Sequence, residues 1–260
     1  MKCTDIAKIL EILAPVKYAE DYDNVGLIAG RSTKDIKKIY LAVDATDEVI
    51  EAAIDFEADL LLTHHPLVFT PLKKITEENF IGRRILRLLQ ADICYYAIHT
   101  NFDVMCMADA AADEMMLKNS QVLQVTFQDE MSKEGIGRYG LLPRTMTLLE
   151  CAEYVKDVFR LPSVQVYGEL DERVEIAAIS PGSAKSAVPY AVQTGVDVLI
   201  SGDVDHHMGI DLMSQGISVI DAGHYGLEKI FVPYMKKYLL RNIPEVKVET
   251  AEEKSPFAVV

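Results

Sequence analysis

The sequence has few basic residues and few cysteines, and it has no long apolar run. Its 26 Lys and Arg residues stand against 40 Asp and Glu, which gives a formal net charge of -14. Proteins that bind nucleic acids need clustered cations to neutralise phosphates, so this balance argues against a nucleic-acid partner. No apolar stretch reaches the roughly 18 residues that a membrane-spanning helix needs, so we expect no association with a membrane.

The four cysteines lack the spacing of a metal-binding or redox motif. Cys3, Cys94, Cys106 and Cys151 form no CxxC pair, and disulfide frameworks are typical of small secreted domains. We therefore expect unpaired thiols that fill the core. Acidic residues interrupt the apolar pattern of residues 1–16, which predicts an amphipathic helix rather than a signal peptide. These features indicate a cytoplasmic protein.

Segments of strand and helix length alternate along the chain in two similar copies. The first copy spans residues 36–98 and the second spans residues 174–221. In each copy the pattern predicts strand, helix, strand, helix and strand. Residues 91–103 align without a gap on residues 216–228, which places His99 opposite His224. Alternating strands and helices predict an α/β fold with parallel or mixed sheets covered by helices, and the similarity favours an internal duplication.

The predicted organisation is two α/β repeats, residues 1–120 and 171–260, joined by a connecting segment, residues 121–170. This segment departs from the repeat pattern, and the glycines between Gly135 and Gly140 predict turns there. A helix is expected over residues 148–159 and a short strand over residues 163–167. No long linker separates the repeats, so we expect them to pack as one unit.

All six histidines fall in three groups that follow predicted strands. His64 and His65 come after residues 59–63, His99 comes after residues 93–98, and the last group holds His206, His207 and His224. Side chains at the carboxyl ends of parallel strands meet at the crevice where α/β sheets bind ligands. Imidazoles mixed with carboxylates are the usual ligands of zinc, iron and manganese, so the pattern predicts a metal site.

Two neighbouring ions fit this set of residues. His64 and His65 would point to opposite faces of a regular strand, but the turn before Pro66 allows both to face one cavity. Asp103 and Glu228 can bridge two ions because a carboxylate has two oxygens and offsets their charge. His224, close to Glu228, would complete the set. Paired metal ions activate water for attack, so hydrolysis is the reaction class indicated.

Other interpretations remain open at this stage. A lone buried histidine is commonly a hydrogen-bonded core residue, and Asp203 and Asp205 can make ordinary surface ion pairs with His206 and His207. We regard His207 as a candidate pocket residue and His206 as structural. The alternative to a hydrolase is a non-catalytic regulatory or scaffold protein that binds metal and acts through protein partners.

Five segments, taken together, resemble the Nif-three-like family of dinuclear-metal proteins, whose members are often labelled GTP cyclohydrolase 1 type 2 homologues. They span nearly the whole chain, and their order is more specific than any one of them. The matching segments are residues 19–27, residues 62–66, residues 99–103, Gly202-Asp203 with His207, and residues 222–228.

The resemblance implies two intertwined α/β repeats, a homohexamer built as a trimer of dimers, and two divalent metal ions in each subunit. By position, the ligands are His64, His65, Asp103, His224 and Glu228, and His99 is a catalytic residue beside the metals or on the substrate. The same segments supply the candidate pocket residues, which are Asn24, Asn101, Asp203, His207 and Tyr225.

The label of the family implies hydrolytic attack on the purine C8 of GTP with release of formate, and therefore a small-molecule substrate of nucleotide type. A triphosphate needs cationic partners. The candidates in this sequence are Lys73, Lys74, Arg83, Arg84 and Arg138. The segment between the two repeats is too short for the extra domain that some members of the family insert there.

Overall fold

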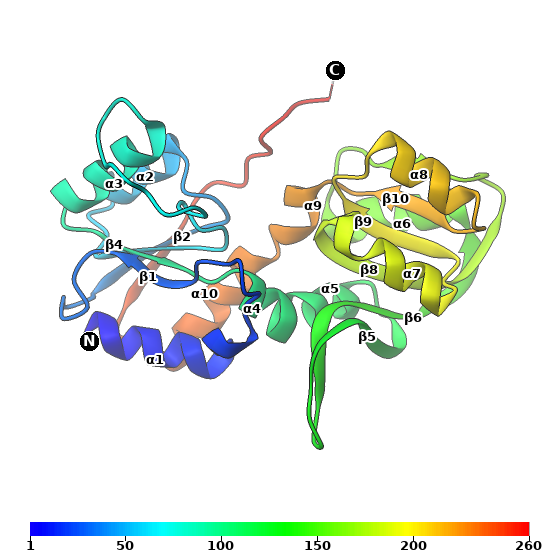
Figure 1. The fold of residues 1–260 in the computed structure, drawn as a ribbon, viewed down its shortest axis with the longest axis horizontal. Coiled ribbons are helices and arrows are strands. Elements are labelled where there is room, and N and C mark those ends of the chain that lie inside the picture. The colour runs from blue at the N-terminus through cyan, green and yellow to red at the C-terminus, as the bar shows by residue number, and fades with distance from the viewer. Residues whose placement is uncertain (260) are drawn as a thin grey trace. The chain divides into compact units, whose positions relative to one another are not determined.

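The computed structural model describes residues 1–259, which form two compact units (Figure 1). Unit 1 comprises Met1–Phe102 and Phe231–Glu253, and unit 2 comprises Asp103–Ile230 and the residues from Lys254 onward. Each unit is thus built from two separate segments of the chain. The boundaries differ from those of the predicted halves, because residues 103–120 belong to unit 2 and residues 231–253 return to unit 1.

Unit 1 contains a five-stranded mixed sheet in the order β1-β4-β3-β2-β11. Strands β2, β3, β4 and β11 run parallel, and β1 pairs with the edge of β4 in the antiparallel sense. The strands are β1 (Gly26–Ala29), β2 (Lys38–Ala42), β3 (Leu60–Thr63), β4 (Cys94–Ala97) and β11 (Lys247–Thr250). Residues of β3 and β4 are buried throughout, which explains their continuous apolar sequence.

Helices cover both faces of the sheet of unit 1 (Figure 1). α2 and α3 pack on the face that includes Leu61 and Tyr95, while α1 and α10 lie on the other side. Thr46 and Asn79 cap α2 and α3 by accepting hydrogen bonds from backbone N–H groups of the first turn. The helices are α1 (Cys3–Leu13), α2 (Asp47–Asp55), α3 (Phe80–Gln90), α4 (Thr100–Phe102) and α10 (Phe231–Asn242), with a 3₁₀ turn at Val16–Tyr18.

Unit 2 contains a six-stranded mixed sheet in the order β5-β6-β8-β9-β10-β7. The central strands β8, β9 and β10 are parallel, and the other three pair in the antiparallel sense. The strands are β5 (Lys118–Gln128), β6 (Lys133–Thr147), β7 (Gln165–Tyr167), β8 (Arg173–Ser183), β9 (Val198–Gly202) and β10 (Ser218–Asp221). The outer part of the β5–β6 hairpin projects beyond the rest of this sheet (Figure 1).

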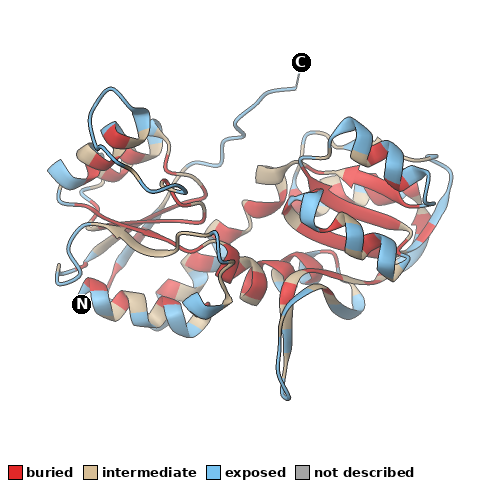
Figure 2. Cartoon of the chain, in the orientation of Figure 1, coloured by how far each residue is buried: buried red, intermediate tan, exposed pale blue. Residues whose placement is uncertain are grey.

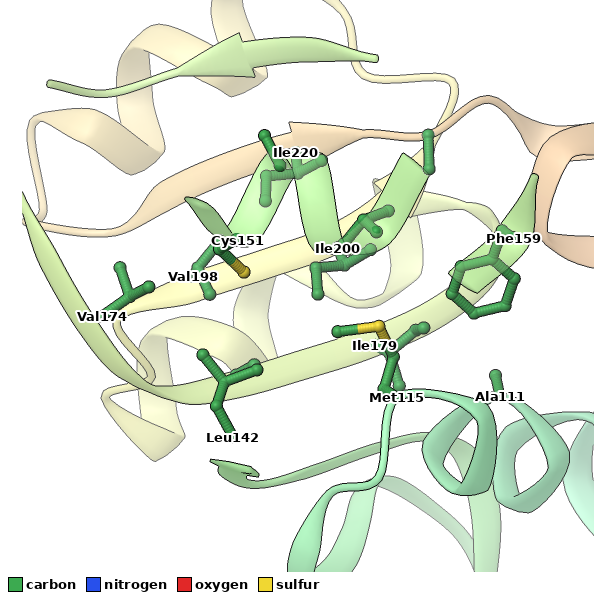
Figure 3. Packing of buried hydrophobic residues seen from close by; sticks show 14 of the residues in the cluster. Ala111, Met115, Leu142, Cys151, Phe159, Val174, Ile179, Val198, Ile200 and Ile220 are labelled. Carbon is green, nitrogen blue, oxygen red and sulfur yellow. The ribbon is translucent and has the colours of Figure 1, made fainter. Parts of the chain in front are cut away.

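Successive side chains along these strands point to opposite faces of the sheet. Ile179 and Ile200 pack against α5 and α6 together with Cys151 and Phe159 (Figure 3), whereas Leu199 points to the opposite face, towards α7 and α8. Buried residues line the central strands and the inner sides of the helices, whereas the outer sides of the helices and most of β5 are exposed (Figure 2). The helices are α5 (Ala108–Glu114), α6 (Leu148–Phe159), α7 (Val188–Thr194), α8 (His206–Met213) and α9 (His224–Glu228), with a π-helical turn at Asp103–Met107 and a 3₁₀ turn at Ala184–Ser186.

The predicted α/β class, with mixed sheets covered by helices, is confirmed, and the internal repeat is visible in the topology. β2, β3 and β4 are parallel and β1 pairs antiparallel with β4; β8, β9 and β10 are parallel and β7 pairs antiparallel with β10. Asp59 and Asp197 occupy equivalent positions. Each accepts two backbone N–H groups of the neighbouring strand through Oδ2, at 2.8 and 3.0 Å for Asp59 and at 2.8 Å twice for Asp197.

The turns predicted between Gly135 and Gly140 were wrong, because this stretch lies inside β6. A Cβ at Gly135 would lie 1.9 Å from the carbonyl oxygen of Gln124, and one at Gly140 would lie 2.7 Å from that of Lys118. The glycines are therefore explained by the close approach of the β5 backbone rather than by a turn.

The four cysteines are buried thiols with no disulfide among them, as their spacing predicted. No helix among the described residues has the length and hydrophobicity to cross a membrane.

Candidate metal centre

Three histidines of unit 1 lie together at the carboxyl ends of β3 and β4. One ring nitrogen from each of His64, His65 and His99 lies within 4.8 Å of the others. β3 ends at Thr63, so His64 and His65 are outside the regular strand, and their ring centroids are only 4.8 Å apart. The ring of His99 is 5.1 Å from that of His64 and 5.4 Å from that of His65.

Each of these imidazoles has a hydrogen-bond acceptor at Nδ1. His64 Nδ1 is 3.0 Å from the carbonyl oxygen of Ile98, His65 Nδ1 is 2.7 Å from Asp44 Oδ1, and His99 Nδ1 is 2.9 Å from Asp23 Oδ1. Carbonyl and carboxylate oxygens only accept, so Nδ1 is the protonated nitrogen. In the neutral ring, Nε2 then has the lone pair, which is the arrangement found in metal-ligating histidines.

Asp23 is tightly held and fixes the orientation of His99. Its side chain is fully enclosed, and it also accepts hydrogen bonds from the backbone N–H and the hydroxyl of Thr100. Burial alone would raise the pKa of Asp23, but the hydrogen bond and charge of His99, with the two donors of Thr100, lower that pKa to about 2. Asp23 is therefore ionised at neutral pH and acts as an acceptor for His99.

Buried hydroxyl groups hold the turn that follows β3. The hydroxyl of Tyr95 donates to the carbonyl oxygen of His65 at 2.9 Å and accepts from the N–H of Leu67 at 2.7 Å. Thr63 also bonds to the same carbonyl oxygen, at 2.7 Å. Burial raises the pKa of Tyr95, so its hydroxyl keeps its proton and can donate to the turn.

Unit 2 contains a second group of candidate ligands at the start of α9. His224 Nδ1 is 2.7 Å from Asp203 Oδ2, and His224 Nε2 is 3.0 Å from Oε2 of the buried Glu228. If Nδ1 donates to Asp203, Nε2 of the neutral ring faces a carboxylate oxygen, and both atoms are electron-pair donors. This contact is favourable when a cation is shared between them, either a proton or a metal ion.

Gly182, at the end of β8, leaves the space that Glu228 occupies. A Cβ at this position would lie 2.7 Å from Glu228 Oε1 and 3.9 Å from His224 Nε2. The φ angle of Gly182 is +83°, in the region that favours glycine. The residue is therefore required both by the backbone and by the carboxylate beside it.

The remaining candidate residues from the sequence are partly buried and hydrogen-bonded and partly exposed. Asn101 is buried, and its side chain accepts from the His99 N–H and donates to the Ala14 carbonyl oxygen. Asn24 donates to the carbonyl oxygen of Val68. His207 is exposed beside His206 in α8. Asp103 begins the π-helical turn of unit 2, and the Tyr225 hydroxyl accepts from the Lys254 N–H.

Reasoning from the sequence missed Asp23, Asp44 and Gly182. Asp44 could have been found, because it follows β2 at the same sheet edge where His64 and His65 follow β3. Asp23 lies 76 positions from His99, outside any strand, and no local pattern relates the two residues.

The fold and the donors together define an α/β protein with imidazole and carboxylate groups suited to transition metals. The chain belongs to the DUF34/NIF3 (NGG1p interacting factor 3) family, whose model matches residues 1–256. It is 34% identical over 264 residues to a protein of Clostridium perfringens described as a GTP cyclohydrolase 1 type 2 homolog, with all of both chains covered. A protein of Methanocaldococcus jannaschii with the same description is 32% identical, with 94% of this chain and 96% of the relative covered.

Solved structures have the same fold. A Bacillus cereus protein related to NIF3 superposes with a TM-score of 0.90 at 22% identity, covering 100% of this chain and 99% of that one. Reduced HcgD from Methanocaldococcus jannaschii superposes with a TM-score of 0.82 at 30% identity, covering 96% and 97% of the two chains. The resemblance first seen in five short segments is thus confirmed over the full length.

Gly182→Ala should weaken metal binding, because the new methyl group would displace the Glu228 carboxylate. Gly216→Ala is the matched control, since Gly216 in the same unit has a φ of +78° and open space around its Cβ position. Both variants should lose about 1–2 kcal/mol of stability from the unfavourable φ. Elemental analysis should show metal loss only in Gly182→Ala, and equal metal contents in both variants would contradict the proposed role of Gly182.

Proposed function

We propose that this protein binds two divalent transition-metal ions, of zinc, iron or manganese, and hydrolyses a small-molecule substrate. The proposed ligands are His64, His65, Asp103, His224 and Glu228. The observation that supports it best is that all four histidines of the two groups have an acceptor-only oxygen at Nδ1. This arrangement leaves Nε2 available for a metal, as in metal-ligating histidines.

In this proposal, each residue of the site has its own role. When bound, a pair of such ions lowers the pKa of water and stabilises negative charge that develops on the substrate. His64, His65 and His224 present Nε2, and the carboxylates of Asp103 and Glu228 offset the positive charge. His99, with its Nδ1–H held by Asp23, exchanges a proton with the reacting group through Nε2.

The cationic side chains proposed to hold a triphosphate have other partners. Arg138 is 4% exposed, with two hydrogen bonds to Asp109. Arg83 and Arg84 both form ion pairs with Asp47. Lys73 and Lys74 remain exposed. A substrate of nucleotide type, as the description of the relatives suggests, would therefore be held mainly by its ring and by the metal ions rather than by an arginine cradle.

Asp103→Ala and Glu228→Ala should each release at least one metal ion from the purified protein. Removing one bridging carboxylate leaves two cations with less compensating charge, so the second ion binds more weakly. Elemental analysis of the two variants and of the wild type, each loaded and then dialysed, gives the stoichiometry. Full occupancy in both variants would exclude these residues as ligands.

His99→Ala should retain most of the metal but lose hydrolytic turnover, by roughly 10- to 100-fold if His99 acts next to the ligands. Metal content, melting temperature and turnover should be measured on one preparation, with a panel of hydrolase substrates. Lost metal would make His99 a ligand, which its distance to His64 and His65 also permits. Lost stability alone would make it structural. A wild type that binds metal but hydrolyses nothing in the panel would favour the scaffold alternative.

We also propose that the protein forms the homohexamer implied by its family resemblance, a trimer of dimers of 29.0 kDa chains. Light scattering at micromolar concentration should give a mass about six times that of one chain. A monomer under these conditions would contradict the proposed assembly but not the proposed metal binding.

A further inference from the structure

Phe69 is a large apolar residue that is 51% exposed beside the three histidines of unit 1. Its ring centroid lies 5.7 Å from that of His99, with an interplanar angle of 83°. Phe102 and Phe231, which lie near His64, are both completely buried. Phe69, in contrast, offers an aromatic surface to solvent beside His99.

Two hydrogen bonds hold the backbone that precedes Phe69. Asn24 donates to the carbonyl oxygen of Val68 at 2.6 Å, and the N–H of Leu67 is bonded to the buried hydroxyl of Tyr95. A half-exposed phenylalanine on a mobile loop would have no defined position. Here the carbonyl group of the residue before Phe69 is hydrogen-bonded, and the exposed ring lies next to His99.

We propose, building on the hydrolase function proposed above, that Phe69 contacts the substrate and selects a flat heteroaromatic ring. An exposed aromatic face gains dispersion and offset stacking with a planar ring, and this attraction tolerates different ring types. The side chains of Arg83, Arg84 and Arg138 are engaged by Asp47 and Asp109, so recognition through the ring fits this chain better than recognition through phosphates. His99, 5.7 Å away between ring centroids, would then lie next to the bound ring.

The test is a binding titration on metal-loaded protein with two probes. Guanosine has a flat heteroaromatic ring and no phosphate, and ribose 5-phosphate has a phosphate and no ring. Phe69→Leu should weaken guanosine binding by at least about fivefold, the lower end of what one stacked base contributes. Binding of ribose 5-phosphate should not change, and Phe69→Tyr should bind guanosine as the wild type does.

Phe80→Leu is the matched control. Phe80 is also in unit 1 and is 53% exposed, but its ring lies under the guanidinium of Arg84. This variant should bind guanosine like the wild type. Metal content and melting temperature, measured for every variant, show whether a loss of binding follows from a damaged site.

Three results would overturn the assignment of Phe69. Phe69→Leu could bind guanosine as tightly as the wild type, or it could weaken the binding of guanosine and of ribose 5-phosphate equally. The third is a wild type that binds none of a set of flat rings that includes guanosine, adenosine and a pterin. Failure of the proposed hydrolase would look different, because turnover would then be absent while Phe69→Leu still weakened ring binding selectively.

Discussion

The hydrogen bond at Nδ1 of each candidate histidine is the interaction on which the site depends. Without it, an imidazole can flip about its χ2 axis or move its proton to the other nitrogen, and either change takes the Nε2 lone pair away from the site. Asp23, Asp44, Asp203 and the carbonyl oxygen of Ile98 prevent this, each in the unit that contains its histidine. The conformational entropy of the rings is therefore lost when the protein folds, and orienting them requires no further loss when a metal binds.

The repeated topology explains why so much of the fold was predictable from the sequence. Buried parallel strands produce continuous apolar runs, and residues 59–63 and 197–201 were recognisable as strands for that reason. The aspartate that precedes each run binds two N–H groups of the neighbouring strand, so its identity is constrained as well. His64, His65 and His99 could be placed together because β3 and β4 are adjacent and parallel.

What could not be predicted depends on contacts between residues that are distant in the chain. The partner of His99 is 76 positions away, and Gly135 and Gly140 of β6 are explained by the carbonyl groups of β5. Gly182 also depends on a distant residue, because the space that a side chain would take there is filled by a carboxylate 46 positions later in the sequence. Local patterns specify strands, helices and their order, whereas the identities of these residues are determined by contacts that form only when distant segments pack together.

The charge of the chain adds a constraint on how it would recognise a substrate. With a net charge of -14, the protein as a whole repels anions, and Arg83, Arg84 and Arg138 have carboxylate partners that offset their charge. Bound cations would then be the strongest local positive charges. In the proposed function, an anionic substrate would be attracted by the same ions that activate it, and the ions together with an aromatic contact would take the place of a basic cradle.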